Sequence, residues 1–262
     1  MTSVRKTILV TGGAKRVGRH IVERLSAAGH RVVIHANAGA AEAEALAKML
    51  HAGGASAWAI AADLSDLGAT EALVPRAMKL VGAPLSGLVN SASIFDFDTP
   101  EAIDAAAFDR AMAVNLRAPA LLSQHFAAQA NAGADNCIVN ILDQKLWNMN
   151  PDFFSYTLSK AGLLSATDMM ARAFAPKVRV NAVAPGLLLP SHDQTQAEFE
   201  ATASRNPMGR PINLDDVVSA VDFLMSNASL TGQVIHADNG QRMAASARDV
   251  IFEARLDPKD NA

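Results

Sequence analysis

Short β-branched runs alternate with longer alanine-rich amphipathic segments along the whole chain. This alternation is typical of βαβ units, in which helices cover both faces of a parallel sheet. Runs such as ILV and CIVNIL are apolar at every position, as strands buried on both faces require. We therefore predict an α/β fold with a single doubly wound, Rossmann-type parallel sheet of about seven strands and helices on both faces.

The expected elements follow directly from this pattern. Strands are predicted at Thr7–Thr11, Arg31–Ala36, Ala57–Ala61, Ser86–Ser91, Asn136–Leu142, Val178–Val183 and Gln233–Ala237, and helices at 16–28, 40–52, 66–81, 102–130, 153–174 and 214–226. No linker rich in Pro, Gly or Ser interrupts them, so residues 1–262 are expected to form one domain. The long proline-containing segment near 187–211 is expected to act as a lid over the site, although a tolerated surface insertion is the alternative.

Composition excludes several classes of protein. The chain has 262 residues, half of them hydrophobic, which is enough for a well-buried core. Its only cysteine, Cys137, rules out an internal disulfide framework, and we expect a cytoplasmic protein without a metal site. A formal net charge of -3 provides no basic surface for nucleic acid or anionic lipid. No apolar run reaches the ~20 residues of a membrane span, so we expect neither nucleic acid nor a membrane as a partner.

A glycine-rich turn follows the first predicted strand. It contains Gly12 and Gly18 and leads into a helix, and such a turn brings unpaired backbone N–H groups and a positive helix dipole to a pyrophosphate. Arg16 stands where a plain dinucleotide fingerprint has its middle glycine, and its cation can reach a phosphate or an anionic substrate edge. A solvated arginine at a helix start is the alternative.

The end of the second predicted strand carries no carboxylate. Enzymes that prefer NAD place Asp or Glu there to hold the ribose 2′-hydroxyl, so this absence favours NADP(H) as the cofactor. No arginine follows either, which leaves His35, Asn37, Arg16 and nearby backbone N–H groups to receive the 2′-phosphate. Asp63, after the third strand, is expected to accept from the adenine amino group or to cap a helix.

The chain contains one tyrosine, Tyr156, and Lys160 follows it by four residues on a predicted helix. This spacing places both side chains on one helical face. A nearby ammonium favours the tyrosinate, so we expect the Tyr156 pKa to lie below the ~10 of a free tyrosine and the phenol to act as general acid or base.

Several motifs in order resemble the short-chain dehydrogenase/reductase family over essentially the whole length. They are TGGAKRVG at 11–18, the Asp63–Leu64 pair, NSAS at 90–93, Asn115, Tyr156 with Lys160, and NAVAPG at 181–186. The resemblance implies that Tyr156 is the general acid/base, that Lys160 holds the nicotinamide ribose, and that Asn115 orders a water of the proton relay. It also implies a border to the cofactor formed by Gly12, Val17, Gly18, Leu64, Asn90, Ala92, Ser93, Pro185, Gly186 and Leu187.

Three departures from the common family pattern narrow the subgroup. Asp143 stands where most members have a serine, and Arg16 replaces a glycine. After the fourth strand, NSAS at 90–93, ending in Ser93 and followed by Ile94 and Phe95, stands in place of the usual Asn-Asn-Ala-Gly. Together they resemble the pteridine reductases and the related dihydromonapterin and dihydrofolate reductases. In that subgroup the matching arginine and serine contact the pterin, the phenylalanine stacks on it, and an Asp–Tyr pair assists protonation.

These observations predict an NADPH-dependent reductase of a pterin or dihydrofolate-like small molecule. The alternatives are a short-chain reductase of a carbonyl substrate, such as a 3-oxoacyl thioester, sugar or alcohol, and a non-catalytic NADP-binding protein. Phe95 has an alternative role in core packing. For Asp143, burial and Lys160 act in opposite directions on the pKa, so its sign of shift stays open.

The resemblance also implies an assembly, a homotetramer that pairs helices 102–130 and 153–174. The chain after Gln241 either reaches a neighbouring subunit's site or frays.

Overall fold

The computed structural model describes residues 5–190, 194–244 and 246–253. Its centre is a seven-stranded sheet in which every neighbouring pair is parallel, in the order β3-β2-β1-β4-β5-β6-β7. The strands are β1 (Thr7–Val10), β2 (Arg31–Ala36), β3 (Ala57–Ala61), β4 (Gly87–Asn90), β5 (Asn136–Ile141), β6 (Val178–Pro185) and β7 (Val234–Ala237). The predicted doubly wound Rossmann-type sheet is thereby confirmed.

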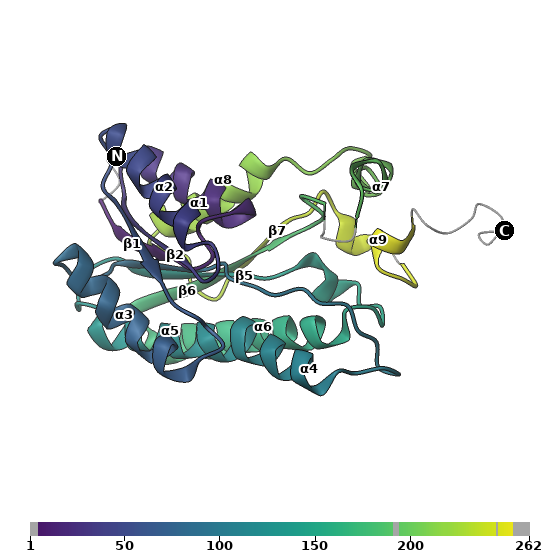
Figure 1. Cartoon of the computed structure of the whole chain (residues 1–262), viewed down its shortest axis with the longest axis horizontal. Coiled ribbons are helices and arrows are strands. Elements are labelled where there is room, and N and C mark those ends of the chain that lie inside the picture. Colours follow the sequence, from purple (N-terminus) through teal and green to yellow (C-terminus); the bar gives the residue numbers. More distant parts are fainter. Residues whose placement is uncertain (1–4, 191–193, 245, 254–262) are drawn as a thin grey trace.

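Helices cover both faces of this sheet, with α1, α2 and α8 on one side and α3, α4, α5 and α6 on the other (Figure 1). The α-helices are α1 (Arg16–Ala27), α2 (Ala40–Ala52), α3 (Leu67–Val81), α4 (Ala105–Met112), α5 (Ala118–Gln129), α6 (Phe154–Phe174), α7 (Gln196–Ala203), α8 (Leu214–Ser226) and α9 (Val250–Glu253). None of the described helices is long and apolar enough to cross a membrane.

The two faces of each strand enter different hydrophobic clusters. On β1, Ile8 and Val10 pack with side chains of α1, α2 and α8, whereas Leu9 packs with side chains of α3 and α5. All three are fully buried, and burial of such a side chain stabilises the fold by roughly 1.5–3 kcal/mol. This explains why the strand sequences are apolar at every position rather than alternating.

The helix predicted over 102–130 is wrong in detail. The chain forms α4, then a π-helical turn η1 (Ala113–Arg117), then α5. Asp104 caps α4 by accepting from the backbone N–H of Ala106, so residues 102–104 precede the helix. In η1, the side chain of Asn115 bonds to the backbone of Ile94 on another loop, which fixes the wider turn at this point.

The carboxyl ends of the strands meet at one edge of the sheet, where α7 and α9 contact each other (Figure 1). Part of the predicted lid, residues 191–193, lies outside the described residues. In doubly wound sheets ligands bind at this edge, so the functional residues are sought there.

Candidate active site

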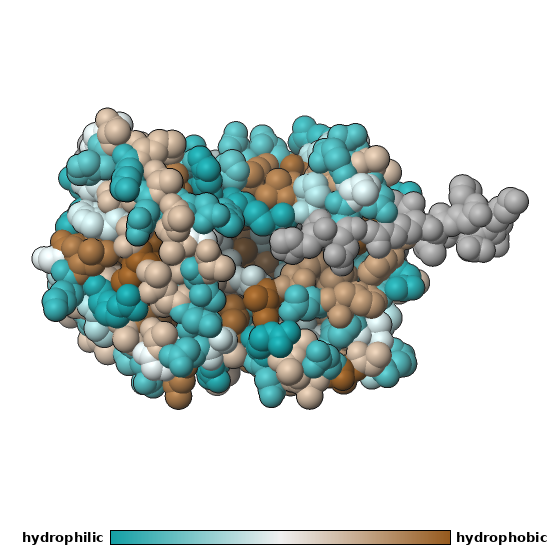
Figure 2. Space-filling model, viewed as in Figure 1, coloured by the Kyte–Doolittle hydropathy of each residue, from teal (hydrophilic) through white to brown (hydrophobic). Residues whose placement is uncertain are grey.

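The loops that follow β1, β4, β5 and β6 enclose a cavity of about 520 Å³. It opens in the middle of the face in Figure 2, where apolar side chains form its floor. Thirteen of the residues predicted from the sequence line it: Gly12, Arg16, Val17, Gly18, Ala92, Ser93, Phe95, Asp143, Tyr156, Lys160, Pro185, Gly186 and Leu187.

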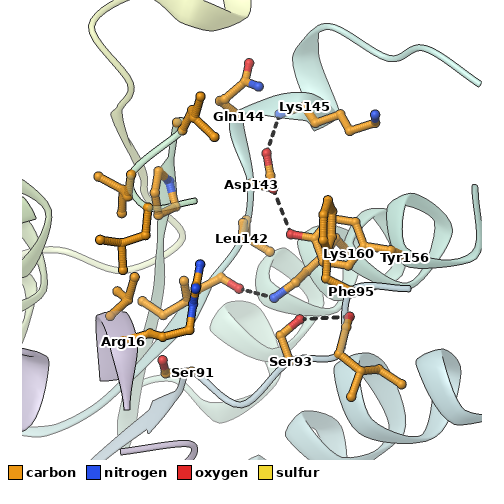
Figure 3. Close-up of a pocket in the computed structure, with 18 of the residues that line it drawn as sticks. Arg16, Ser91, Ser93, Phe95, Leu142, Asp143, Gln144, Lys145, Tyr156 and Lys160 are labelled. Carbon is orange, nitrogen blue, oxygen red and sulfur yellow. Dashed lines mark hydrogen bonds between the residues drawn. The ribbon is translucent and has the colours of Figure 1, made fainter. Parts of the chain in front are cut away.

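The glycine turn is built for close backbone approach. Gly12 has a φ of 63°, and a Cβ there would lie 2.9 Å from the Cα of Ala92. A Cβ on Gly18 would lie 2.1 Å from the carbonyl oxygen of Gly12, so neither position accepts a side chain without displacement of backbone. Arg16 itself has a left-handed backbone, with a φ of 50°, a conformation that favours glycine. This exposed residue lines the cavity, and its side chain enters the view of Figure 3 from α1.

His35 does not face the cavity, and the expectation that it receives a phosphate is wrong. Its Nδ1 accepts from the backbone N–H of Gly12 at 3.2 Å and its Nε2 donates to the carbonyl of Ala62 at 3.1 Å. Burial lowers the pKa of His35 to about 4, so the ring is neutral. The residue instead supports the glycine turn from beneath, and its backbone carbonyl also accepts from Gly13 N–H.

Asn37 lies just after β2 and is exposed. Hydrogen bonds from Ser65 lower the pKa of Asp63, and the side-chain amide of Asn37, which lies nearby, lowers it further. Asp63 accepts from the backbone N–H and hydroxyl of Ser65 at 2.9 and 2.8 Å. The helix cap considered for Asp63 is therefore wrong, because Asp66 caps α3.

Lys15 is a cation at this end of the cavity that the sequence reasoning missed. It lines the cavity, and a Cβ on Gly39 would lie 3.3 Å from its Cε. Its Nζ forms an exposed ion pair with Glu42 at 2.6 Å. The ammonium therefore lies beside the backbone that follows β2.

Asn90 and Leu64 lie beneath the cavity rather than along it. Asn90 is 1% exposed and donates to Asn140 at 2.8 Å, and Asn140 in turn donates to Thr167 at 2.9 Å. Leu64 belongs to the hydrophobic cluster under α3 and α5. Both side chains are enclosed by protein, and the expectation that the two residues border a cofactor stays a prediction.

Asn115 is fully buried, and its side-chain amide forms hydrogen bonds to other groups of the protein. Its Oδ1 accepts from Ile94 N–H at 2.9 Å and from the Ser93 hydroxyl at 3.2 Å, and its Nδ2 donates to Ile94 O and to Ser159 Oγ, each at 3.0 Å. The side chain thereby ties the loop after β4 to α6. Its predicted contact with a relay water stays a prediction.

Asp143, Tyr156 and Lys160 meet on one side of the cavity (Figure 3). Tyr156 donates from its hydroxyl to Asp143 Oδ2 at 2.7 Å, and Asp143 Oδ1 accepts from the backbone N–H of Lys145 at 2.8 Å. Asp143 is the cap of a short 3-10 helix, η2 (Gln144–Trp147), which fixes the carboxylate. Lys160 lies one turn along α6 from Tyr156, and its Nζ donates to the carbonyl of Ile141 at 2.7 Å.

The expected low pKa of Tyr156 is wrong in this structure. Burial raises its pKa well above the ordinary value, and the adjacent Asp143 carboxylate raises it further. Lys160 does not offset this, because its Nζ points to a carbonyl and lies 5.8 Å from the phenol ring centroid. Burial lowers the Lys160 pKa to about 8 and also raises the pKa of Asp143, which gives the sign that the sequence left open.

Aromatic side chains form the wall beside Tyr156. Phe95 stacks on Phe153 with ring centroids 3.9 Å apart and meets the Tyr156 ring edge-on at 4.7 Å. Phe95 is half-buried and lines the cavity, so it combines the packing role with an exposed surface toward the site. Trp147 lies instead edge-on against His236 at 4.2 Å and is not among the described lining residues.

The chain after Gln241 returns over its own site, so fraying is wrong for the described part. Asp249, Val250 and Ile251 line the cavity, and Ile251 packs with Phe153 and Tyr156. At the start of the segment predicted to be a lid, Leu187 N–H donates to Gln241 Oε1 at 2.8 Å.

Several supporting residues escaped the sequence reasoning. Asp98 accepts from the backbone N–H of Ser155 at 3.0 Å and holds the start of α6, while Lys145, Asp152 and Asp249 form a buried ionic network. Their partners lie from 57 to 104 residues away in the chain. No local spacing signals such contacts, although charged residues beside a predicted site are a reason to examine them.

The fold and this site define a class of protein, the Rossmann-type oxidoreductases with a tyrosine and a lysine on one helix. Comparisons agree. The family model described as enoyl-(acyl carrier protein) reductase matches residues 12–242. An oxidoreductase of Methylorubrum extorquens is 31% identical over 90% of this chain and 98% of its own length. The chain therefore belongs to the short-chain dehydrogenase/reductase family and is an oxidoreductase of that family.

Solved structures give two further similarities. The crystal structure of FolM alternative dihydrofolate reductase 1 from Brucella canis, complexed with NADP, is 41% identical and superposes with a TM-score of 0.89 over 95% of this chain and 98% of that one. The angucycline C-6 ketoreductase LanV with bound NADP is 30% identical, with a TM-score of 0.84 over 91% of this chain and 96% of that one.

Proposed function

We propose that the protein is an NADPH-dependent reductase of a pterin, dihydropterin or dihydrofolate-like substrate. The observation that carries the proposal is the 2.7 Å hydrogen bond between Tyr156 and Asp143 at the wall of the cavity. Similarity to the Brucella dihydrofolate reductase supports it, and so does the carboxylic acid in the place where most family members carry a serine.

The residues present fit a dinucleotide. Close approach at Gly12 and Gly18, where no Cβ is accommodated, leaves the backbone N–H groups at the start of α1 open to a pyrophosphate. Arg16 and Lys15 line the same end, and none of the residues 37–41 that directly follow β2 is acidic, as suits a cofactor with a 2′-phosphate. Lys160, Pro185, Gly186 and Leu187 would hold the nicotinamide end. NADPH, when bound, supplies the hydride.

The protein's own contribution is a proton. Reduction of a C=N bond leaves a nitrogen that must be protonated, and Tyr156 is placed to donate to it. Its hydroxyl donates to Asp143 in this structure, so delivery to a substrate requires Asp143 to carry a proton and return it to the phenol oxygen. Burial raises the pKa of Asp143, which favours the protonated acid. A serine at this position would supply no comparable acid.

The ring of Phe95 gives the site a flat wall suited to a planar substrate. It stands edge-on to Tyr156, so a ring packed on its exposed surface would lie close to the phenol. Ser93 lies in the same loop and is exposed, with a hydroxyl that can contact polar atoms of that ring.

A substrate panel tests the proposal. NADPH oxidation is followed at about 340 nm with dihydrobiopterin, dihydromonapterin and dihydrofolate, beside acetoacetyl thioesters. We expect turnover of at least one pterin or folate and a kcat/KM at least about 100-fold lower for the thioesters. Turnover of thioesters alone would instead assign carbonyl reduction, the chemistry of ketoreductase relatives such as LanV.

We further propose a cytoplasmic homotetramer. Leu158 and Met169 on α6 are large apolar side chains exposed to solvent, 40% and 68% respectively, on one of the helices expected to pair. The buried free thiol of Cys137 suits a reducing compartment. Light scattering coupled to size exclusion, together with cell fractionation, tests both statements, and a monomer in solution would refute the first.

A further inference from the structure

Lys145 and Asp249 form a buried ion pair beside the catalytic side of the cavity. Lys145 Nζ lies 2.6 Å from Asp249 Oδ2, and both residues line the cavity. The same ammonium donates to Asn150 Oδ1 at 2.6 Å. Lys145 is 3% exposed and Asp249 is 8% exposed, so each charge depends on the other for compensation.

Lys145 also holds the acid of the site. Its backbone N–H donates to Asp143 Oδ1 at 2.8 Å, which leaves Oδ2 directed at the Tyr156 hydroxyl (Figure 3). In Figure 3 the Lys145 side chain extends away from Asp143. One residue therefore contacts the acid through its backbone and the chain's C-terminal segment through its side chain.

That segment, residues 246–253, is also held by Asp152. Asp152, which is 1% exposed, accepts from Arg248 Nε at 2.8 Å and from the backbone N–H of Asp249 at 2.7 Å. Two residues beyond Asp249, Ile251 packs against Tyr156. The segment thus reaches both members of the Asp143–Tyr156 pair, one through Lys145 and the other by direct packing.

We propose that Lys145 and Asp249 are positioning residues that fix Asp143 against Tyr156 and balance the charge around this proton-donating pair. The proposal deepens the proposed function and rests on it. The charged or titratable groups that face Asp143 are Tyr156 and Lys160 from α6, Lys145 from η2 and Asp249 from the C-terminal segment. The Asp249 carboxylate raises the pKa of both Asp143 and Tyr156, and the Lys145 ammonium lowers the pKa of Asp143.

The two charges therefore act on the proton in opposite directions, which provides the test. Reduction needs the proton, so kcat falls as pH rises through the apparent pKa of the Asp143–Tyr156 pair. We expect Asp249→Asn to move this alkaline limb to lower pH and Lys145→Met to move it to higher pH. Each variant is also expected to lower kcat by about 10- to 100-fold through misplacement of Asp143, with NADPH affinity retained.

Matched variants separate positioning from general stability. Asp168→Asn removes one partner of the exposed Arg172–Asp168 pair, whose atoms are 3.0 Å apart, and is expected to leave kcat and the limb unchanged. Lys145→Arg keeps the positive charge, so the alkaline limb of its kcat profile should lie at the same pH as that of the wild type. The double variant Lys145→Met with Asp249→Leu removes both charges and should return the limb toward that of the wild type. Single variants that shift the limb in the same direction, or not at all, would overturn the proposal.

A second measurement needs no substrate. Ultraviolet titration of Tyr156, the only phenol, should show a lower pKa in Asp249→Asn than in the wild type when circular dichroism shows both proteins folded. An unchanged Tyr156 pKa in the folded variant would contradict the role of Asp249 even if no pterin is turned over. Absence of pterin and folate turnover by the wild type, by contrast, would overturn only the proposed function.

Discussion

The Tyr156 hydroxyl donates to Asp143 Oδ2 at 2.7 Å, and this contact joins the two acids of the site into one proton-holding unit. Burial raises the pKa of both groups. A phenol that donates to a carboxylate directs its proton toward that carboxylate, whereas a phenol that accepts from a carboxylic acid can direct its own proton to a substrate and regain one from the acid. The protonation of Asp143 therefore governs the direction in which Tyr156 donates.

The lone tyrosine makes this unit directly observable. Without added NADPH, we expect ultraviolet difference spectra to show no tyrosinate below about pH 10, because burial and the Asp143 carboxylate raise the Tyr156 pKa. Asp143→Asn should lower the Tyr156 pKa, because it removes the neighbouring negative charge. A wild-type phenolate signal near neutral pH would contradict the geometry described for Lys160.

His35 should make stability depend on pH. Its pKa is about 4 in the folded protein against 6.5 in an unfolded chain, so the unfolded state binds more protons between these values and stability falls as pH falls through that window. As the pH falls from about 7 to about 5, this single group should lower the free energy of unfolding by roughly 2 kcal/mol.

Urea unfolding of wild type and His35→Asn measures this effect. We expect the variant to be less stable near neutral pH by about 1–3 kcal/mol, because buried hydrogen bonds to Gly12 and Ala62 are lost. The difference between the two proteins should shrink near pH 5. A difference that is the same at both pH values would show that His35 does not titrate on unfolding as described.

Lys15 should help to select the cofactor. Its ammonium lies beside the backbone after β2, where a 2′-phosphate is expected, and Glu42 at 2.6 Å is its partner in this structure. Lys15→Ala should raise the KM for NADPH by about tenfold while the KM for NADH changes little, since a charged hydrogen bond contributes about 1.5–3 kcal/mol.

Two variants complete this comparison. Glu42→Gln should leave NADPH binding unchanged or tighter, because it frees the ammonium. Arg19→Ala, which breaks an exposed pair with Glu23 on the same helix, is the control and should have no effect. Equal losses for NADPH and NADH in Lys15→Ala would mean that Lys15 does not contact the 2′-phosphate.

The sequence predicted the sheet and the elements on it because both signals are local. Periodicity identified the strands, and the four-residue spacing placed Tyr156 and Lys160 on one helical face. The resemblance to the family, in which most members have a serine at this position, pointed to Asp143. The structural role of His35 could not be predicted in the same way. A histidine at a strand end can bind a phosphate or form hydrogen bonds to a neighbouring turn. The positions of Gly12 and Ala62, which are set by the fold, determine that His35 does the second.

The ionic network around Asp249 could not be predicted from the sequence either. Asp249 and Lys145 are 104 residues apart, and the C-terminal segment carries no pattern that indicates where it folds back. The pKa of Tyr156 was mispredicted for a related reason. Helical spacing places Lys160 on the same face, but the carbonyl of Ile141 determines where its ammonium points.

The most direct test compares turnover of a dihydropterin, or of dihydrofolate, by wild type, Asp143→Asn and Tyr156→Phe at neutral pH, with NADPH affinity measured in parallel. Both substitutions remove a proton-delivering group but leave the glycine turn and Lys160 intact. We predict that each lowers kcat by about 100-fold or more while the Kd for NADPH stays within about threefold of that of the wild type. Near-normal turnover in both variants would contradict proton delivery by the Asp143–Tyr156 pair.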